Sequence, residues 1–355
     1  MTAKKWLSIV FLLTGMIMIP LGGINYFIDP LWTFSHEHRW NQTQSDFDER
    51  QQKTNYVEAH QMEAYDSLLL GSSRSTHINQ NDFKKMHLFN YAVSGMYPHE
   101  YKGYIDFFKR KIGHPLKYIV IGADFYNILM PSENAQFKEP RFYIQNSEDF
   151  FYKYRMLFTL DLFKKSLKNI RYTYKGKDVY YDRKNIKYSH HVSESARLKA
   201  YTRNLKQHTE AFVKRPLNPD YLELLIEIKR ENPESQIVVF TSPITANLLV
   251  SILRSADKLE DYKTWLRNLV DIFGQVYHFM DINSITTNLQ NYPDDDHYYD
   301  HVAKALVARI SGRENEHLPK DFGVILEKST IEAYLEKFEK AFALYQVSNV
   351  SPTHK

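Results

Sequence analysis

The stretch Asp66-Ser-Leu-Leu-Leu-Gly-Ser-Ser-Arg-Ser75 decides how the rest of the chain is interpreted. Its apolar run, roughly residues 66–71, is typical of a buried strand, and Gly71 permits a tight turn directly after it. Ser73 follows this glycine, so its hydroxyl is expected at the end of the strand, on the edge of a sheet. Taken alone, the turn is equally consistent with an ordinary turn and helix cap.

A second stretch, Asp294-Asp-Asp-His-Tyr-Tyr-Asp-His301, brings carboxylates and imidazoles to the start of a helix predicted at residues 299–311. A serine becomes nucleophilic when an imidazole lies within hydrogen-bond reach, and a carboxylate fixes the tautomer of that imidazole. The two stretches together could therefore supply a nucleophile, a base and an orienting carboxylate. Backbone N–H groups of Ser73 and Gly95 could serve as oxyanion donors.

The second stretch has two other interpretations. His297 and His301 are four residues apart, so on one helix they would share a face and could bind a metal ion with Asp294 or Asp300. Alternatively, the acidic residues only cap the helix, since carboxylates are favourable at a helix N-terminus. No third distant ligand stands out, and we predict neither a metal nor a cofactor.

Composition excludes several classes of function. The chain has 355 residues, of which 43% are hydrophobic, enough for one large domain or two ordinary ones. It contains no cysteine, which excludes disulfides, cysteine-ligated zinc and a thiol nucleophile. The formal charge of +4 is small for this length and gives no argument for a nucleic-acid partner.

Alternation of apolar strands with helices predicts an α/β fold with a parallel sheet covered on both faces. Parallel sheets place functional sites at the carboxyl ends of their strands, where Ser73, Gly95 and Asp124 are predicted to lie. Beyond the first strand, strands are predicted at residues 88–93, 117–122, 236–241 and 276–281, and helices at residues 46–64, near 80–85, 98–111, 218–232, 257–273, 299–311 and 330–346.

The N-terminal run from Trp6 to Phe27 contains no charged residue and is long enough to span ~30 Å of hydrocarbon. Lys4 and Lys5 precede it, which predicts a cytoplasmic N-terminus and a periplasmic or extracellular remainder. A cleaved signal peptide is the alternative. The long apolar core, followed by a poor cleavage site, favours a single-pass anchor in the cell membrane.

These observations predict five consecutive parts of the chain. The segment between the third and fourth strands is longer than a simple crossover connection, and it is rich in Tyr, Lys and Arg. We interpret it either as a solvated helical flap or as a groove for a polymeric or anionic substrate. The predicted parts are a cytoplasmic N-terminus at 1–5, an anchor at 6–27, a linker and helix at 28–64, an α/β domain at 65–312 with a helical insertion at about 130–215, and an amphipathic helix and tail at 313–355.

The motifs in combination resemble the SGNH (GDSL-like) hydrolase superfamily, which has a flavodoxin-like three-layer α/β/α fold. The similarity consists of the serine turn, a glycine after the second strand, Gly-x-Asp at residues 122–124 and the late Asp294-x-x-His297 pair. Within this superfamily, the chain most resembles the membrane-anchored extracytoplasmic acyltransferase and esterase branch, because it has both an anchor and the sequence Leu-Gly-Ser-Ser-Arg-Ser. That branch includes alginate acetylation proteins and DltD-like teichoic-acid D-alanylation proteins. The similarity covers about residues 65–125 and 236–311.

The resemblance implies roles for individual residues. Ser73 would be the nucleophile, His297 the base, Asp294 the orienting carboxylate and Gly95 the oxyanion glycine. Asp124 departs from the pattern, because many members have Asn there and a carboxylate donates no hydrogen bond unless it is protonated.

The carboxylate at position 124 leaves two alternatives for the oxyanion hole. Asp124 either fixes Ser73 or Arg74, or the oxyanion hole uses backbone donors alone. Asp124 and Arg74 are accordingly predicted to belong to the oxyanion or substrate-binding part of the site.

The function implied by the resemblance is that of an O-acyltransferase or carbohydrate esterase acting through an acyl-enzyme at Ser73. The acyl group would be acetyl, the substrate an envelope or exported polysaccharide, and a membrane-embedded O-acyltransferase is a candidate partner and acyl donor. The alternative is a non-catalytic polysaccharide-binding or assembly protein that retains the fold, which Asp124 favours.

Overall fold

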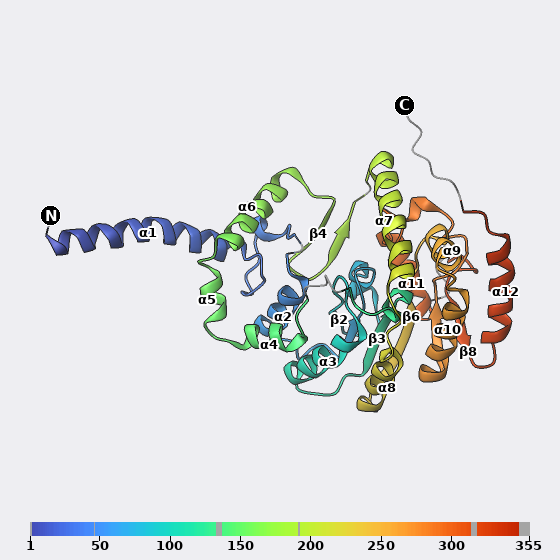
Figure 1. The fold of residues 1–355 in the computed structure, drawn as a ribbon. Helices are drawn as coiled ribbons and strands as arrows, with labels where there is room; N and C mark the ends of the chain where they lie inside the picture. Colours follow the sequence, from blue (N-terminus) through green and yellow to red (C-terminus); the bar gives the residue numbers. More distant parts are fainter. Residues whose placement is uncertain (1, 46, 133–136, 191, 314–317, 348–355) are drawn as a thin grey trace. The chain divides into compact units, whose positions relative to one another are not determined.

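A computed structural model describes residues 2–45, 47–132, 137–190, 192–313 and 318–347 (Figure 1). The chain divides into two compact units, which we call the anchor unit (Met1–Met62 and Lys138–Tyr188) and the sheet unit (Glu63–Phe137 and Ser189–Lys355). The segment predicted as an insertion at about 130–215 is thereby shared between the two units.

The sheet unit contains a six-stranded, mostly parallel sheet with the strand order β2-β1-β3-β6-β7-β8. All neighbouring strands are parallel except β7 and β8, which are antiparallel. The predicted α/β class is confirmed, and β8 is an edge strand that the sequence did not predict. The strands are β1 Ser67–Leu70, β2 Leu88–Asn90, β3 Tyr118–Ala123, β6 Gln236–Thr241, β7 Gln275–His278 and β8 Val324–Glu327.

Both faces of this sheet are buried, which explains why its central strands are almost continuously apolar. Leu69, Val120 and Phe240 share a core cluster with Val302 and Leu306 on one face. Residues that alternate with them, such as Leu68 and Ile119, point to the other face and are equally buried. The helices of this unit are α3 Pro98–Ile112, α7 Glu194–Lys214, α8 Tyr221–Glu231, α9 Ala246–Ser255, α10 Leu259–Phe273, α11 Asp300–Ile310 and α12 Ile331–Leu344.

The helix expected near residues 80–85 is replaced by two short 3₁₀ turns, at Ser75–His77 and Gln80–Asp82. The side chain of Asn90 explains the difference, because its Nδ2 donates to the carbonyl oxygens of Ser75 and Ile78. These carbonyls are therefore satisfied without a continuing helix. The segment stays tight against the end of β1.

Two glycines let this turn approach the sheet closely. Gly71 has φ +155°, a backbone conformation that side chains rarely adopt, and a Cβ at Gly71 or Gly122 would collide with Ser75 Oγ. Ser75 thus packs directly on the ends of β1 and β3. The close packing fixes the direction in which the chain leaves β1 at Ser73.

The anchor unit begins with α1 (Ala3–Ile28), the only described helix that is long and apolar enough to cross a membrane. An 18-residue window of this helix has a mean hydropathy of 2.2, and only 11% of that window is buried. Its topology and orientation remain predictions. The rest of the unit is α2 Glu49–Ala59, α4 Pro140–Glu148, α5 Tyr152–Met156, α6 Leu160–Lys175 and the hairpin of β4 Val179–Tyr181 and β5 Lys187–Ser189.

Candidate active site

The strands β1 and β2 are parallel neighbours, so the turn after β1 and the loop after β2 lie at the same edge of the sheet. The parallel pairing continues beyond the strands, since the N–H of Val93 donates to the carbonyl oxygen of Gly71 at 3.1 Å. Ser73 is partly exposed, and Gly95 is exposed with φ +63°. Both predicted residues therefore follow strands that end side by side, at the carboxyl edge of the sheet.

Ser73, His297 and Asp294 form a continuous chain of short contacts. Ser73 Oγ lies 2.9 Å from His297 Nε2, and His297 Nδ1 lies 2.9 Å from Asp294 Oδ2. The first contact joins residues 224 positions apart in sequence, and the second joins residues three apart. The structure thus brings together the three residues predicted as nucleophile, base and orienting carboxylate.

Asp294 also holds the loop that carries the imidazole. Its Oδ1 accepts the backbone N–H groups of Asp296 at 3.0 Å and His297 at 2.8 Å. One carboxylate therefore fixes both the backbone and the ring of His297. This arrangement orients the ring with little freedom to rotate away from Ser73.

Asp296 is a second carboxylate beside the imidazole, and sequence reasoning missed it. Its Oδ1 lies 2.9 Å from His297 Nδ1. Its Oδ2 lies 3.0 Å from Arg74 Nη2 and 3.0 Å from His208 Nε2 on α7. Asp296 thus joins three basic side chains from three separate parts of the sheet unit.

Arg74 and Asp124 form a buried ion pair underneath this cluster. Arg74 Nη1 lies 3.2 Å from Asp124 Oδ1, and the two side chains are 7% and 0% exposed. Of the alternatives for Asp124, the structure shows the one in which it fixes Arg74. Both residues had been predicted for oxyanion or substrate binding, which stays a prediction; the structure shows their contact with each other.

The charges of the cluster shift the protonation of the imidazole. Burial alone would raise the pKa of Asp296, but His297, His208 and Arg74 bring it well below its usual range. Burial alone would lower the pKa of His297, but Asp296 and Asp294 raise it to about 10. The two carboxylates therefore favour the protonated form of His297.

His208 and Asp295 extend the same network. Burial opposes the charge of His208, but the neighbouring Asp296 raises its pKa above the ordinary value for histidine. Asp295 is 0% exposed, and among the described residues no donor reaches either of its carboxylate oxygens. Burial, reinforced by the charge of Asp296, raises the pKa of Asp295 to about 7.

The backbone beside Ser73 offers a donor for an oxyanion. Within the described part of the chain, the N–H of Ser73 makes no hydrogen bond. The loop that carries Gly95 is held by Asn127, whose Nδ2 donates to the carbonyl oxygen of Met96 at 3.3 Å. The buried amide of Asn127 therefore supports this loop.

His297 and His301 do not share a helical face, so the predicted basis for a metal site at these two residues is wrong. The helix α11 begins at Asp300, so His297 precedes it and the two rings share no helical face. His301 Nε2 instead lies 2.9 Å from Asn291 Oδ1.

Among the described residues, two other groups of ligand atoms are close enough to hold an ion: His208, Asp295 and Asp296, and Asp294, Asp296 and His297. Both use Asp296, whose oxygens already contact three basic side chains. A metal ion would have to displace these contacts. The arrangement as it stands is a charge-balanced network.

The residues that sequence reasoning missed carry weak signals. Three consecutive aspartates precede His297, and the Asp-x-x-His spacing singles out Asp294 alone. His208 lies in a basic helix, 88 positions before Asp296, and no local pattern distinguishes it from a surface histidine. Only the fold reveals that α7 carries this ring to the cluster.

No protein-family model, no curated protein and no solved structure matches this chain. The resemblance to SGNH hydrolases stays a prediction, and function is inferred from the geometry of Ser73, His297 and Asp294.

Proposed function

We propose that this chain is a membrane-anchored serine acyltransferase or esterase of SGNH type. The single observation that carries the proposal is the run of contacts from Ser73 Oγ through His297 to Asp294, each of 2.9 Å. A hydroxyl, an imidazole and a carboxylate in this order form the arrangement that activates a serine for acyl transfer.

In the first half-reaction, Ser73 Oγ attacks the carbonyl carbon of an acyl ester while His297 Nε2 accepts the hydroxyl proton. The N–H groups of Ser73 and Gly95 would donate to the oxyanion that forms. The bond between the carbonyl carbon and the alkoxy oxygen then breaks, and the leaving alcohol takes the proton from His297. The product of this half is an ester of Ser73.

In the second half-reaction, a hydroxyl group attacks the Ser73 ester and gives its proton to His297. The acyl–Ser73 bond breaks, and Ser73 Oγ recovers the proton. A sugar hydroxyl makes the enzyme a transferase, whereas water makes it an esterase, and both share the same acyl-enzyme. Exclusion of water from the closed site determines which reaction dominates.

The substrate and location follow from the resemblance and from α1. We propose that the acyl group is acetyl and that the acceptor or substrate is an envelope or exported polysaccharide. A membrane-embedded O-acyltransferase would supply the acyl group. The proposed topology is a cytoplasmic N-terminus with the catalytic unit outside, supported by the two lysines before the apolar run.

A serine-directed reagent tests the proposal directly. The full chain is treated with a fluorophosphonate probe or p-nitrophenyl acetate, and the modified peptide is identified by mass spectrometry. We expect an adduct on Ser73 that Ser73→Ala abolishes and that Ser72→Ala retains, because Ser72 is buried and its Oγ accepts the N–H of Arg74. An adduct on another residue, or none over a wide pH range, contradicts the proposal.

A second function is favoured by one observation, the carboxylate at Asp124. Because its partner is Arg74, this position supplies no side-chain donor to an oxyanion. A non-catalytic polysaccharide-binding or assembly protein with the same fold would tolerate that loss. Retained polysaccharide binding without any adduct on Ser73 would establish this alternative.

A further inference from the structure

An exposed aromatic and apolar surface lies in the anchor unit, outside the proposed reaction site. Phe150, Phe151 and Leu160 are 66%, 65% and 66% exposed, and Tyr154 and Phe158 are 43% and 47% exposed. Large apolar side chains gathered in this way on a surface mark a contact with a membrane or another molecule. We call residues 149–168, which carry them, the contact segment.

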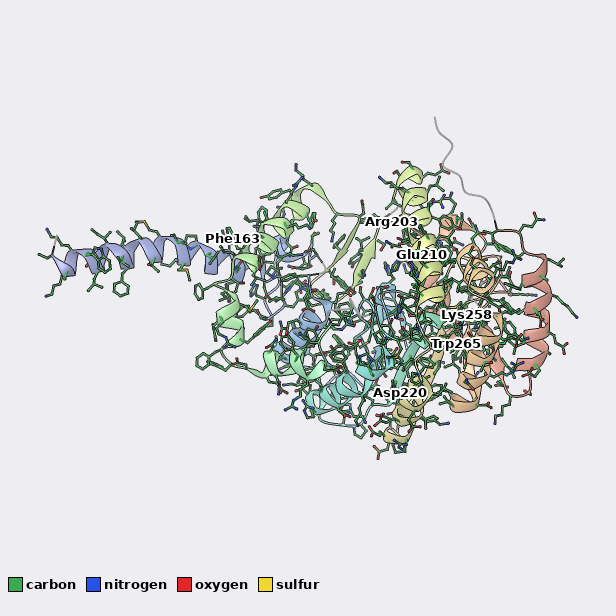
Figure 2. The ribbon with its side chains drawn as sticks, viewed as in Figure 1. Phe163, Arg203, Glu210, Asp220, Lys258 and Trp265 are labelled. Atoms are coloured by element: carbon green, nitrogen blue, oxygen red, sulfur yellow. The ribbon has the colours of Figure 1, made fainter. Side chains whose placement is uncertain are left out.

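The contact segment is tied to the last turns of α1. Asn25 Nδ2 donates to the carbonyl oxygen of Leu157 at 2.8 Å, and Asn25 Oδ1 accepts from Ser166 Oγ at 2.8 Å. The ring of Phe158 lies directly over Gly22, where a Cβ would come within 2.8 Å of it. Figure 2 shows Phe163 of α6 beside the same end of α1.

These contacts fix the depth of the segment if α1 spans a membrane. At ~1.5 Å per residue, the helix rises about 28 Å between Trp6 and Asn25, close to the ~30 Å thickness of bilayer hydrocarbon. Asn25 therefore lies at the outer boundary of the hydrocarbon. Phe158 packs on Gly22, one turn earlier, so its ring lies just inside the hydrocarbon. Leu157 contacts Asn25, so the segment around Phe158 lies at the boundary with the lipid headgroups.

The charge of the contact segment suits that level. It contains five basic and two acidic residues, the basic ones being Lys153, Arg155, Lys164, Lys165 and Lys168. Lys153 Nζ lies 5.4 to 5.9 Å from the ring centroids of Tyr154, Phe150 and Phe34. Aromatic rings with lysine and arginine are typical of the membrane–water interface.

We propose that the contact segment lies in the outer headgroup layer of the bilayer, with its exposed phenylalanines at the hydrocarbon boundary and its basic residues on anionic headgroups. The occupant of this surface is the lipid itself. The inference goes beyond the proposed function, since it requires α1 to span a membrane but requires no catalysis. According to this inference, the anchor unit is attached to the bilayer by α1 and is also held at a fixed depth in it.

The absence of cysteine from the chain makes the test free of background labelling. Single cysteines are introduced by Phe151→Cys and Leu160→Cys in the full chain and labelled with an environment-sensitive fluorophore. The labelled proteins are placed in nanodiscs whose lipids carry spin labels either near the headgroup or deep in the acyl chain. Met16→Cys, within α1, is the control for a spanning helix.

The same fluorophore conjugated to free cysteine is the control, because it shows how far the dye alone enters the lipid of these nanodiscs. We expect strong quenching of the labels at Phe151→Cys and Leu160→Cys by the shallow spin label. We further expect deep quenching at Met16→Cys and no quenching of the free conjugate. Stronger quenching of the first two labels in anionic than in zwitterionic nanodiscs supports the headgroup contact.

Three results overturn the proposal. In the first, the label at Met16→Cys is quenched but the labels at Phe151→Cys and Leu160→Cys are not, which places the contact segment in water. Shielding in native membranes, but not in nanodiscs, assigns the surface to a protein partner. Quenching of the free conjugate equal to that of Phe151→Cys assigns the signal to the dye rather than to the contact segment. None of these results bears on the adduct at Ser73, so the two proposals fail separately.

Discussion

The guanidinium of Arg74 lies 3.2 Å from the carboxylate of Asp124, and both side chains are buried. Arg74 follows Ser73 directly in sequence, yet its side chain turns inward and contacts Asp296 as well. The residue after the proposed nucleophile thus links the end of β1 to the loop that carries His297. The ion pair couples the position of the serine to the position of its base.

Replacement of Arg74 is expected to be costly. Arg74→Met leaves Asp124 and Asp296 buried without their shared cation, and breaking a buried ion pair costs about 3–5 kcal/mol. Chemical denaturation measures the loss in free energy of unfolding. Arg267→Met is the control, because its pair with Glu332 is exposed and contributes about 0–1 kcal/mol. Equal effects of the two variants would contradict a structural role for Arg74.

The two carboxylates near His297 Nδ1 can be ranked by mutation. Asp294→Asn is expected to lower kcat by about 10³–10⁴, because an amide no longer selects the correct tautomer of the base. Asp296→Asn is expected to cost less, since Asp294 still holds both the backbone and the ring of His297. Hydrolysis of p-nitrophenyl acetate measures both. A larger loss for Asp296→Asn would exchange the roles of the two aspartates.

The pH profile of catalysis should be displaced toward alkaline pH. His297 acts as a base only when neutral, and Asp296 and Asp294 raise its pKa to about 10 against the opposing effect of burial. We therefore expect kcat/KM to rise with pH well above the usual pKa of histidine. Asp296→Asn removes one of these charges and should move the acid limb to lower pH. An acid limb that stays in place in Asp296→Asn shows that Asp296 leaves the base unperturbed.

Replacement of Asp295 by asparagine is expected to increase the thermal stability of the fold. Its pKa is raised by burial from 3.8 to about 7, so the folded state binds its proton more tightly than the unfolded state. The carboxylate therefore destabilises the fold increasingly between about pH 4 and pH 7, and fully above pH 7. Asp295→Asn should raise Tm at pH 8 and leave it nearly unchanged at pH 4, measured by calorimetry. A fall in Tm at pH 8 would indicate that a bound cation normally compensates Asp295.

The sequence predicted the central sheet well because each central strand is a compact apolar run. Residues 117–122 and 236–241 correspond closely to β3 and β6, where burial on both faces requires a continuous apolar pattern. The edge strand β8 escaped prediction. It is short, antiparallel and partly exposed, so neither its length nor its pattern separates it from a loop.

The site was predictable to the extent that local motifs define it. Ser73 and the pair of Asp294 and His297 stand out because their spacing encodes a turn and a short loop. His208 and Asp296 interact only through the tertiary placement of α7, which spacing cannot express. The contact of Arg74 with Asp124 was among the alternatives considered for position 124, whereas its contact with Asp296 depends on tertiary placement.

The separation of the proposed triad along the chain has a consequence for folding. Asp294 and His297 are three residues apart and bond to each other within one loop, whereas Ser73 lies 224 positions away from His297. The local pair can form early, but the contact with Ser73 requires β1, β3, β6 and β7 to be assembled first, since contacts distant in sequence form slowly. Recovery of serine reactivity during refolding would therefore report completion of the sheet, later than any signal from the helices.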